Sequence, residues 1–324
     1  MAASLSRGPL RVAIMTDETG WHTARLKQAL RARACEGRCV NLADCRIDTT
    51  WAWHGLVIPG YGRGLPDAVI VRGLASGSFE QVTLRLGILH ALRELGVPVY
   101  NDARAIERSV DKGMTSFLLH LAGIPTPATW VSESAPQAQR TVMRESAAGR
   151  ALVLKPLFGS QGKGLQRIGT VDAGHAPVPL PALAAYRQVA YLQRFVPSPA
   201  APGKPGFDWR VLVIGGRAVA AMRRVSQGWI HNVAQGARCE HAEITPALAT
   251  LAVRATEALG LDYAGVDLVP IGEGAATDRA MVIEVNGVAA WHGLQSVTET
   301  DIAGLLVDDL LARKLPAARH GAVA

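Results

Sequence analysis

The sequence predicts an α/β protein, because its first hundred residues alternate between short apolar strands and amphipathic helices. The first predicted helix places Leu26 and Leu30 on one face, as a helix packed on a sheet requires. Alternation of this kind is typical of a parallel sheet covered by helices. The predicted strands span 10–17, 66–73 and 97–101, and the predicted helices span 20–34 and 78–96.

The carboxyl ends of parallel strands are where ligands collect in such sheets. Asp17 follows the first predicted strand and Arg72 follows the second, so both are candidate site residues. Arginine grips a carboxylate with two parallel hydrogen bonds, and Ser76 and Ser78 lie close to Arg72 in the sequence. We therefore regard these residues as candidates to bind a substrate.

Hairpins, rather than parallel units, dominate the rest of the chain. Gly215 and Gly216 lie at the expected turn of a long strand pair over residues 208–225. One helix has Thr245 as its expected N-cap and Gly260 as its C-terminal glycine. The other expected elements are a hairpin at 151–168, strands at 189–196, 263–271 and 279–287, helices at 111–123, 245–260 and 301–314, and linkers or poorly ordered loops at 172–185 and 197–206.

The composition limits the classes of partner. With 324 residues, 49% of them hydrophobic, the chain is long enough for a sizeable core in two or three domains. Lys and Arg outnumber Asp and Glu by 34 to 27, but the excess is scattered and fits acidic small molecules about as well as nucleic acid. Only 5% of residues are aromatic, and no basic stretch is interleaved with them. A nucleic-acid partner that stacks its bases on the protein is therefore not expected.

The cysteines and the N-terminus point to a cytoplasmic protein. Three cysteines crowd one N-terminal stretch, which leaves a metal site open as the alternative to reduced thiols. The apolar run at 12–15 is too short for a signal peptide, and no stretch approaches the roughly 18 apolar residues of a membrane span. We therefore expect no membrane association. The four cysteines are Cys35, Cys39, Cys45 and Cys239, none of them in a CxxC pair.

The stretch "LVLKPLFGSQGKGL", residues 152–165, places three glycines and two lysines directly after a short apolar run. It is not a Walker loop, because no Ser or Thr follows Lys163, and it lacks the dinucleotide pattern G-x-G-x-x-G. Backbone N–H groups of a glycine loop can turn toward an anion, since no side chain blocks the approach. The stretch predicts a phosphate-binding hairpin carrying Lys163, with Lys155 on the strand before it. A plain surface hairpin is the alternative.

A second group of residues suits a divalent cation. Glu284 and Asn286 in "VIEVN" point to the same face of a strand, and Asp267 lies in "GVDL" on a strand that can pair with it. Few, hard oxygen ligands suit Mg²⁺ bound together with ATP. The alternative is that these are ordinary polar strand residues. However, acids are depleted in strands and are costly in apolar surroundings without a partner.

Arginines lie on the strands between these two features. Arg210 is in "DWRVLV", and Arg223 and Arg224 are in "AAMRRV". Arginines aimed at a transferring phosphoryl group stabilise its charge. In a regular strand Arg223 and Arg224 point to opposite faces, so at most one of them faces the site. We expect that one to be Arg223, with Arg224 on the solvated surface.

The motifs "VLKPLFGSQGKGL", "DWRVLVIGGRAVAAMRR", "GVDL" and "VIEVN", in this order and spacing, resemble the RimK-like branch of the ATP-grasp carboxylate–amine ligases. The resemblance covers most of the chain. It implies an ATP-grasp fold of mixed α/β and α+β character, with a Rossmann-like N-terminal preATP-grasp domain. We expect the boundaries at 1–103 for that domain, 104–190 for the central subdomain with the glycine-rich lid, and 191–324 for the C-terminal subdomain with the metal site.

The resemblance also implies the chemistry and the cofactors. The γ-phosphate of ATP passes to a substrate carboxylate, and an amine then attacks the acyl phosphate to form an amide. The implied cofactors are ATP and Mg²⁺, with Mn²⁺ as an alternative metal. Lys112 in "SVDKGMTSFLL" resembles the first phosphate-contacting lysine and Lys155 the second. The lid over the phosphates corresponds to Gly159, Ser160, Gln161, Gly162, Lys163 and Gly164.

The same resemblance implies roles for residues of the C-terminal half. In "YLQRFV" the backbone of Arg194 and Val196, on either side of Phe195, would contact adenine, while Gln193 would line the pocket. Many relatives have an acidic residue in place of Arg194, so only a backbone role is carried over there. In the pattern "D-x-R", Asp208 precedes Arg210, which would steady the acyl phosphate, and Asn232 matches an asparagine near the triphosphate. Asp267, Glu284 and Asn286 match the Mg²⁺ ligands.

The ending "EVNGVAAWHGLQSVTETDIA" is similar to that of ligases of amino-acid and pterin cofactor biosynthesis. We therefore expect an amino acid, glutamate in the first place, to be added to a small carboxylated acceptor such as a tetrahydromethanopterin-type cofactor, by a homo-oligomer (a dimer or a tetramer). The alternatives are glutamate ligation to a protein C-terminus and a non-catalytic ATP-binding regulatory module. His22, His231 and His292 are expected to be structural or substrate-contacting, since both reacting groups come from the substrates.

Overall fold

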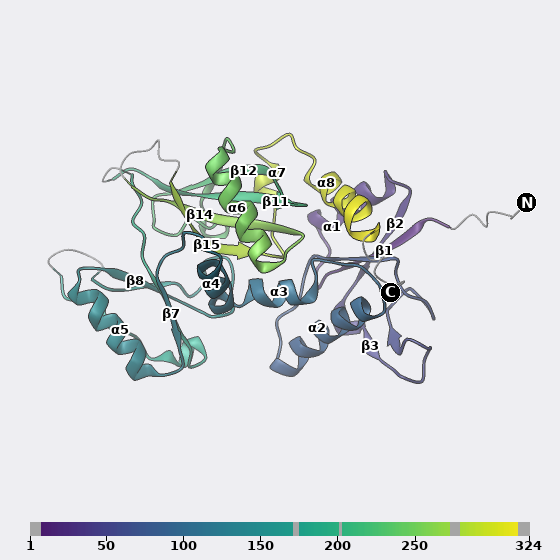
Figure 1. The fold of residues 1–324 in the computed structure, drawn as a ribbon, viewed down its shortest axis with the longest axis horizontal. Coiled ribbons are helices and arrows are strands. Elements are labelled where there is room, and N and C mark those ends of the chain that lie inside the picture. The colour runs from purple at the N-terminus through teal and green to yellow at the C-terminus, as the bar shows by residue number, and fades with distance from the viewer. Residues whose placement is uncertain (1–7, 171–174, 201–202, 273–278, 317–324) are drawn as a thin grey trace, which may run out of the picture.

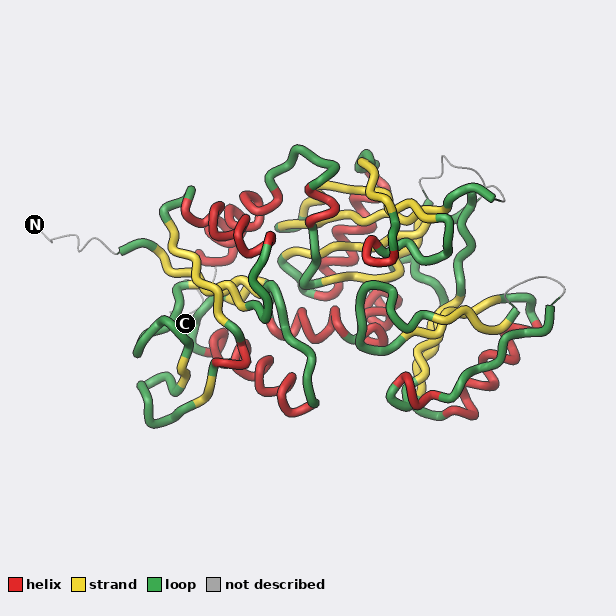
Figure 2. The backbone as a smooth tube through the Cα atoms, turned by 180° about the vertical axis from the view of Figure 1, so that it is seen from behind, coloured by secondary structure: helices red, strands yellow, loops and turns green. Residues whose placement is uncertain are grey.

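The structure, a computed structural model, describes residues 8–170, 175–200, 203–272 and 279–316. It is elongated, with the N-terminal domain at one end, the central subdomain at the other and the C-terminal subdomain between them (Figure 1). Figure 2 shows the same three groups of strands from behind. Each group forms its own main sheet, and a separate short strand pair, β3 and β4, belongs to the N-terminal domain.

The N-terminal domain is built on a four-stranded parallel sheet with the order β2-β1-β5-β6, as the alternating pattern predicted. The central strands β1 and β5 are apolar and buried from Val12 to Met15 and from Ala68 to Val71, because helices cover both faces, whereas the edge strand β2 also carries Glu36 and Arg38. The elements are β1 (Leu10–Met15), α1 (Trp21–Arg31), β2 (Cys35–Val40), η1 (Leu42–Asp44), β3 (Arg46–Ile47), β4 (Leu56–Val57), β5 (Ala68–Val71), α2 (Phe79–Glu94), β6 (Val99–Tyr100) and α3 (Ala103–Val110).

The central subdomain is an antiparallel sheet of order β7-β10-β8-β9, covered by α5. Strand β10 belongs to this sheet although the expected boundary at 190 assigned most of it to the C-terminal subdomain. The predicted glycine hairpin is confirmed as the β8–β9 pair. The linker expected at 172–185 is wrong in part: Leu183 and Tyr186 of a short 3₁₀ helix are buried in the core, and residues 171–174 lie outside the described residues. The elements are α4 (Lys112–Leu121), β7 (Thr129–Ser132), α5 (Ala135–Ala147), β8 (Ala151–Lys155), β9 (Gln166–Gly169), η2 (Leu183–Tyr186) and β10 (Ala190–Arg194).

The C-terminal subdomain is a five-stranded antiparallel sheet of order β13-β12-β11-β14-β15, with α6 packed on one face. The predicted caps of α6 are confirmed: the Thr245 hydroxyl accepts from the Leu248 N–H, and Gly260 is left-handed with φ 75°. The elements are β11 (Gly206–Ile214), β12 (Arg217–Ser226), η3 (Val233–Gln235), β13 (Arg238–His241), α6 (Pro246–Leu259), β14 (Tyr263–Pro270), β15 (Ala280–Asn286), α7 (His292–Gln295), α8 (Ile302–Asp309) and η4 (Leu310–Lys314).

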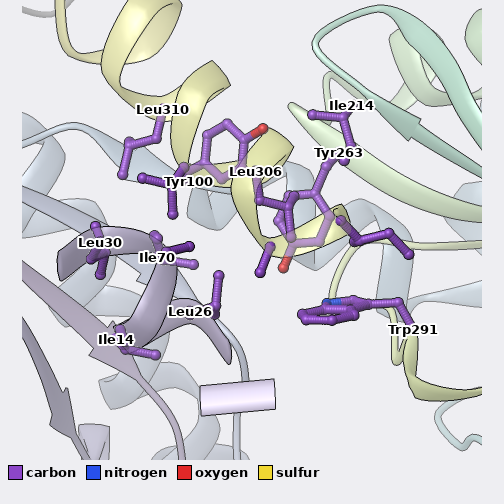
Figure 3. Packing of buried hydrophobic residues seen from close by; sticks show 14 of the residues in the cluster. Ile14, Leu26, Leu30, Ile70, Tyr100, Ile214, Tyr263, Trp291, Leu306 and Leu310 are labelled. Atoms are coloured by element: carbon purple, nitrogen blue, oxygen red, sulfur yellow. The ribbon is translucent and has the colours of Figure 1, made fainter. Parts of the chain in front are cut away.

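One apolar core joins the N-terminal domain to the C-terminal subdomain. Helix α8 packs on α1, so residues from both ends of the chain bury one another. In the central subdomain, α5 and the sheet form a core of their own, whereas α4 packs on α6 and β15 of the C-terminal subdomain. Figure 3 shows the shared core, which includes Ile14, Leu26, Leu30, Ile70, Tyr100, Ile214, Tyr263, Trp291, Leu306 and Leu310.

The Asn101 side chain stabilises the same junction between the N-terminal domain and the C-terminal subdomain with hydrogen bonds. It is completely buried, donates to the backbone carbonyls of Tyr263 and Gly287, and accepts from the N–H groups of Asp262 and Tyr263. A buried amide with all these partners holds the start of β14 against the end of β6.

In the part of the chain that the structure describes, every helix is too short or too polar to cross a membrane.

Candidate active site

A cavity of about 500 Å³ lies between the central sheet and the C-terminal sheet. One wall is formed by the glycine loop of the β8–β9 hairpin, and the opposite wall by strands β11, β12, β14 and β15. Most of the candidate nucleotide and metal residues line this cavity. They are Lys112, Lys155, Gly159, Ser160, Gln161, Gly162, Lys163, Gln193, Arg194, Phe195, Val196, Asp208, Asn232, Asp267 and Glu284.

Two lysines approach the cavity from different elements. Lys112 begins α4, and its Nζ donates to the Gly159 carbonyl at 2.6 Å and lies 3.6 Å from Glu284 Oε1. Lys155 ends β8, and its Nζ donates to Gln193 Oε1 at 2.7 Å. Burial lowers the pKa of Lys155 to about 8, although nearby Glu284 opposes this shift. Both lysines therefore face one cavity. Lys112 is bound to the glycine loop, and Lys155 has a pKa only slightly above neutral pH.

The lowered pKa of Lys155 leads to a prediction about nucleotide affinity. A phosphate anion needs the protonated ammonium, and this form is lost as pH rises through about 8. We expect the apparent Kd for Mg-ADP to be nearly constant below that pH and to rise about tenfold for each pH unit above it. Calorimetric titration across this range is the measurement. A Lys155→Met variant should bind weakly with a flat profile, and the same upward bend in that variant would contradict the assignment.

The glycine loop is folded against the segment that follows β12. Gly162 has φ 70°, and a Cβ there would lie 2.7 Å from Asn232 Oδ1 and 2.9 Å from Ile230. A side chain at Gly162 is therefore excluded both by the left-handed backbone and by the contact. Gln235 adds a hydrogen bond from its Nε2 to the Gln161 carbonyl at 3.2 Å. Asn232 thus lies directly under the loop, and Gly164, also left-handed, packs on Pro156.

The last residues of β10 lie beside the cavity. Gln193 is buried, and its Nε2 lies 3.2 Å from both Thr129 Oγ1 and the Tyr191 hydroxyl, so its carbonyl oxygen is aimed at Lys155. The Arg194 N–H is used within the sheet, where it donates to the Ala128 carbonyl. An adenine contact through the Arg194 backbone would therefore have to use its carbonyl.

The Arg194 side chain belongs to a separate ion-pair cluster. Its guanidinium lies 2.9 Å from Glu145, a carboxylate with only 2% exposure on α5 that also binds Arg150 at 2.7 Å. This explains how a basic residue fits at a position where the resemblance suggested an acid. Glu145 was not foreseen from the sequence, since a lone Glu in a helix carries no signal of its partners.

The aspartates and arginines of the C-terminal sheet form one buried network. Asp267 binds Arg210 through two hydrogen bonds of 2.6 and 2.7 Å, and Arg224 at 3.0 Å. Arg224 in turn binds Asp208 through both carboxylate oxygens. Burial by itself raises the pKa of Asp267, but Arg210 and Arg224 outweigh it and leave that pKa lowered. Asp208 differs from Asp267, because burial outweighs Arg224 and raises its pKa to about 7.

The expectation that Arg223 faces the site is wrong. The Arg224 side chain is 3% exposed and lines the cavity, whereas the Arg223 side chain is 44% exposed and pairs with Glu240 on the outer face. The cause is a bulge in the β11–β12 pair at Leu212, beyond which the register shifts by one residue. A one-residue shift exchanges the faces of a strand, so Asp208 lies opposite Arg224 rather than Arg223.

The candidate metal ligands are brought together by strand pairing. Asp267 lies directly opposite Glu284, and Gly265 opposite Asn286, in the β14–β15 register. The Asn286 amide nitrogen donates to the Gly265 carbonyl at 3.3 Å, which turns its oxygen the other way. Two carboxylates and an amide oxygen are a hard donor set that fits Mg²⁺. Asp267 also forms ion pairs with Arg210 and Arg224, which the spacing of residues along the strands did not predict.

The candidate substrate residues lie at the edge of the N-terminal sheet. The carboxylate of Asp17, on the exposed loop after β1, reaches within van der Waals distance of Gly73, next to Arg72. Arg72 Nη1 donates to the Ala289 carbonyl at 2.7 Å, so this arginine bridges to the C-terminal subdomain. Ser76 is exposed, and the Ser78 side chain is used as the N-cap of α2. The structure therefore places Asp17 close to Arg72, whereas the Ser78 side chain caps helix α2.

Other residues at the cavity were missed or left open by the sequence. Phe195 and Trp229 meet edge to face with ring centroids 6.0 Å apart and both line the cavity, but they are distant in sequence. His231 also lines it, with a buried Nε2 that has no partner among the described residues, and burial lowers its pKa to about 4. Neutral His231 fits a structural or ligand-contacting role. Its neighbour Asn232 was the only part of this segment that the resemblance marked.

Comparison with known proteins agrees with this architecture. Family models match residues 10–106 as a RimK PreATP-grasp domain and residues 109–310 as a RimK-like ATP-grasp domain. A tetrahydromethanopterin:alpha-L-glutamate ligase of Methanococcus maripaludis is 38% identical over 93% of this chain and 98% of its own length. A probable alpha-L-glutamate ligase of Thioalkalivibrio sulfidiphilus is 31% identical over 92% of this chain and 94% of its own. The structure of the ATP-grasp ligase PsnB with a phosphomimetic variant of minimal precursor, Mg and ADP superposes with a TM-score of 0.66, at 23% identity over 94% of this chain and 98% of that one.

The fold, the cavity and these matches define an ATP-grasp ligase. Within that class, the chain belongs to the RimK-like ATP-grasp family. The resemblance drawn from the sequence motifs is thereby confirmed, together with the expected ATP-grasp fold and its parallel preATP-grasp domain. The division into three parts and the roles of individual residues remain predictions.

Proposed function

We propose that this protein uses ATP to join L-glutamate to a carboxylated small molecule through an amide bond. The observation that carries the proposal is the convergence of Lys112, Lys155, Asp267 and Glu284 on one cavity beneath a glycine loop. The names of the relatives support glutamate as the amino acid, and the 38% identical relative supports a tetrahydromethanopterin-type acceptor.

The cavity walls fit Mg-ATP. Lys112 and Lys155 are the cations for the phosphates, and the glycine loop covers them with Asn232 beneath it. The adenine would contact the Arg194 carbonyl and the Val196 N–H, beside Phe195 and Trp229. Asp267, Glu284 and Asn286 would hold Mg²⁺, or Mn²⁺ in its place. When bound, the metal neutralises charge on the phosphate oxygens.

The reaction then needs no nucleophile from the protein. A carboxylate oxygen of the acceptor attacks the γ-phosphorus, the bond to the β-phosphate oxygen breaks, and ADP leaves. The glutamate amine attacks the acyl carbon, loses a proton, and inorganic phosphate leaves as the amide forms. The protein contributes position and charge. We assign Arg210, fixed by its two bonds to Asp267, to the acyl phosphate, and Arg224 to the support of Asp208 and Asp267.

The test is ADP release from Mg-ATP and glutamate across a panel of carboxylated acceptors that includes tetrahydromethanopterin. We expect ADP only with a matching acceptor, and a product heavier by one glutamyl residue in the mass spectrum. Lys155→Ala and Glu284→Ala proteins are the controls and should form neither. Tight ATP binding with no ADP under any pairing would overturn the proposal in favour of a regulatory module. A product found only with peptides ending in a free carboxylate would reassign the acceptor to a protein C-terminus.

A further inference from the structure

Aromatic and basic side chains gather where the N-terminal domain meets the C-terminal subdomain. The Trp21 ring, at the start of α1, lies 4.8 Å from the Trp291 ring and 4.5 Å from the His292 ring, measured between centroids. The Arg25 guanidinium lies 5.7 Å from the Trp21 ring centre. We call Trp21, Arg25, Arg72, Trp291 and His292 the aromatic–basic patch.

The patch exposes the Trp21 ring to solvent and also contains two buried nitrogen atoms without hydrogen-bond partners among the described residues. Trp21 is 37% exposed, although large aromatic side chains at a domain junction are usually covered. Trp291 is only 1% exposed, yet its Nε1 has no hydrogen-bond partner among the described residues. The Arg72 Nε is also buried, and it too has no hydrogen-bond partner among the described residues. Both nitrogen atoms are covered by protein, whereas a ligand at the surface can reach Trp21, Arg25 and His292.

His22 does not compete for such a ligand. Its Nε2 accepts the Trp291 backbone N–H at 3.1 Å, and burial together with Arg72 and His292 lowers its pKa to about 4. A neutral His22 therefore braces Trp291 rather than adding charge. The positive charge of the patch comes from Arg25 and Arg72, and Asp17 beside Gly73 is the acid on the neighbouring loop.

The patch adjoins the arginine assigned to the acyl phosphate. Arg72 is anchored on the Ala289 carbonyl, and Ala289 in turn packs over Gly265: a Cβ built on Gly265 would lie 3.0 Å from Ala289 Cβ and 3.5 Å from Arg210 Cδ. Gly265 also lies opposite Asn286 in the sheet. A single layer of small residues thus separates the patch from the candidate reaction centre.

We propose that the aromatic–basic patch binds the acceptor and selects one that carries a planar ring together with acidic groups. The ring stacks on Trp21 and His292, while acidic oxygens bind Arg25 and Arg72. Glutamate has no ring and gains nothing from the exposed face of Trp21. This inference rests on the proposed ligation of a carboxylated acceptor and names the substrate class that the acceptor side takes.

The first test measures binding to the full chain without ATP or glutamate. The two probes are pteroylglutamate, which has a planar ring and acids, and N-acetylglutamate, which has the acids alone. We expect pteroylglutamate to bind at least about tenfold more tightly than N-acetylglutamate, because ring stacking supplies the difference. Trp21→Ala should remove that difference, Trp21→Phe should retain most of it, and Arg72→Ala should weaken both probes. Trp53→Ala removes an 84% exposed tryptophan elsewhere on the N-terminal domain and is the matched control with no expected change.

Equal affinity of the two probes for the unmodified protein, or no effect of Trp21→Ala, would overturn the inference. A second measurement separates it from the proposed function. With the acceptor found by ADP release, Trp21→Ala should raise the acceptor KM about tenfold and leave the glutamate KM unchanged. A raised glutamate KM instead assigns the patch to the amino acid and refutes the inference. Ring-dependent binding without any ligation would refute the proposed function and support the patch.

Discussion

Replacing Glu284 with glutamine should lower kcat/KM for acceptor-dependent ADP release at least about 100-fold, the usual order of loss when one charged group of a phosphoryl-transfer site is removed. Glu284 lies opposite Asp267 and 3.6 Å from Lys112, so the amide takes a charged oxygen from the donor set and leaves the lysine without its counter-ion. We also expect the Mg²⁺ concentration needed for half-maximal rate to rise. Steady-state kinetics with Mg²⁺ titration measures both effects.

The control for this variant is Glu240→Gln. Glu240 lies on β13, where it pairs with Arg223 and Arg238 on the outer face of the same sheet. The same chemical change there should leave the rate and the Mg²⁺ dependence within a factor of about two, because exposed ion pairs contribute little. An unchanged Mg²⁺ dependence in Glu284→Gln would remove Glu284 from the proposed metal site.

Replacing Arg224 with alanine should lower the free energy of unfolding by about 3–5 kcal/mol. Arg224 is buried between Asp208 and Asp267, and its removal leaves Asp208 without its bidentate partner and Asp267 with Arg210 alone. Removing one member of a buried ion pair is costly, because the remaining charge is neither solvated nor balanced. Urea denaturation followed by circular dichroism is the measurement.

The neighbouring arginine provides the comparison for this prediction. Arg223→Ala removes an identical side chain one position away, from a surface pair with Glu240, and should cost less than about 1 kcal/mol. The two variants carry the same change in net charge, so any difference between them arises from burial. Equal losses for both would show that the buried network does not stabilise the sheet.

Much of the fold could be predicted because its signals are local. Glycines mark the hairpin turns, Thr245 and Gly260 mark the ends of α6, and alternating strands and helices predict the parallel sheet. Two candidate metal ligands, Glu284 and Asn286, could be placed on one face, because side chains two residues apart share a face of a strand. Asp267 and Glu284 needed only the pairing of neighbouring strands to meet.

The rest depended on contacts that sequence spacing does not contain. Strand alternation indicated that only one of Arg223 and Arg224 faces the site, but it could not say which one, because that depends on the bulge at Leu212. The partnership of Arg194 with Glu145 joins residues about fifty positions apart, and the aromatic–basic patch brings Trp21 to Trp291 across most of the chain. Such long-range contacts depend on how the elements and domains pack together, and neither the periodicity nor the composition of the sequence predicts this packing.

The core shared by α1 and α8 has a mechanical consequence for the catalytic cycle. The N-terminal domain and the C-terminal subdomain are joined by common apolar packing and by Asn101, whereas α5 and the central sheet are packed separately. We expect nucleotide exchange to proceed by rotation of the central subdomain and its glycine loop, while the acceptor-facing surface keeps its shape. ADP would then be able to leave without disturbing a bound acceptor or its glutamylated product.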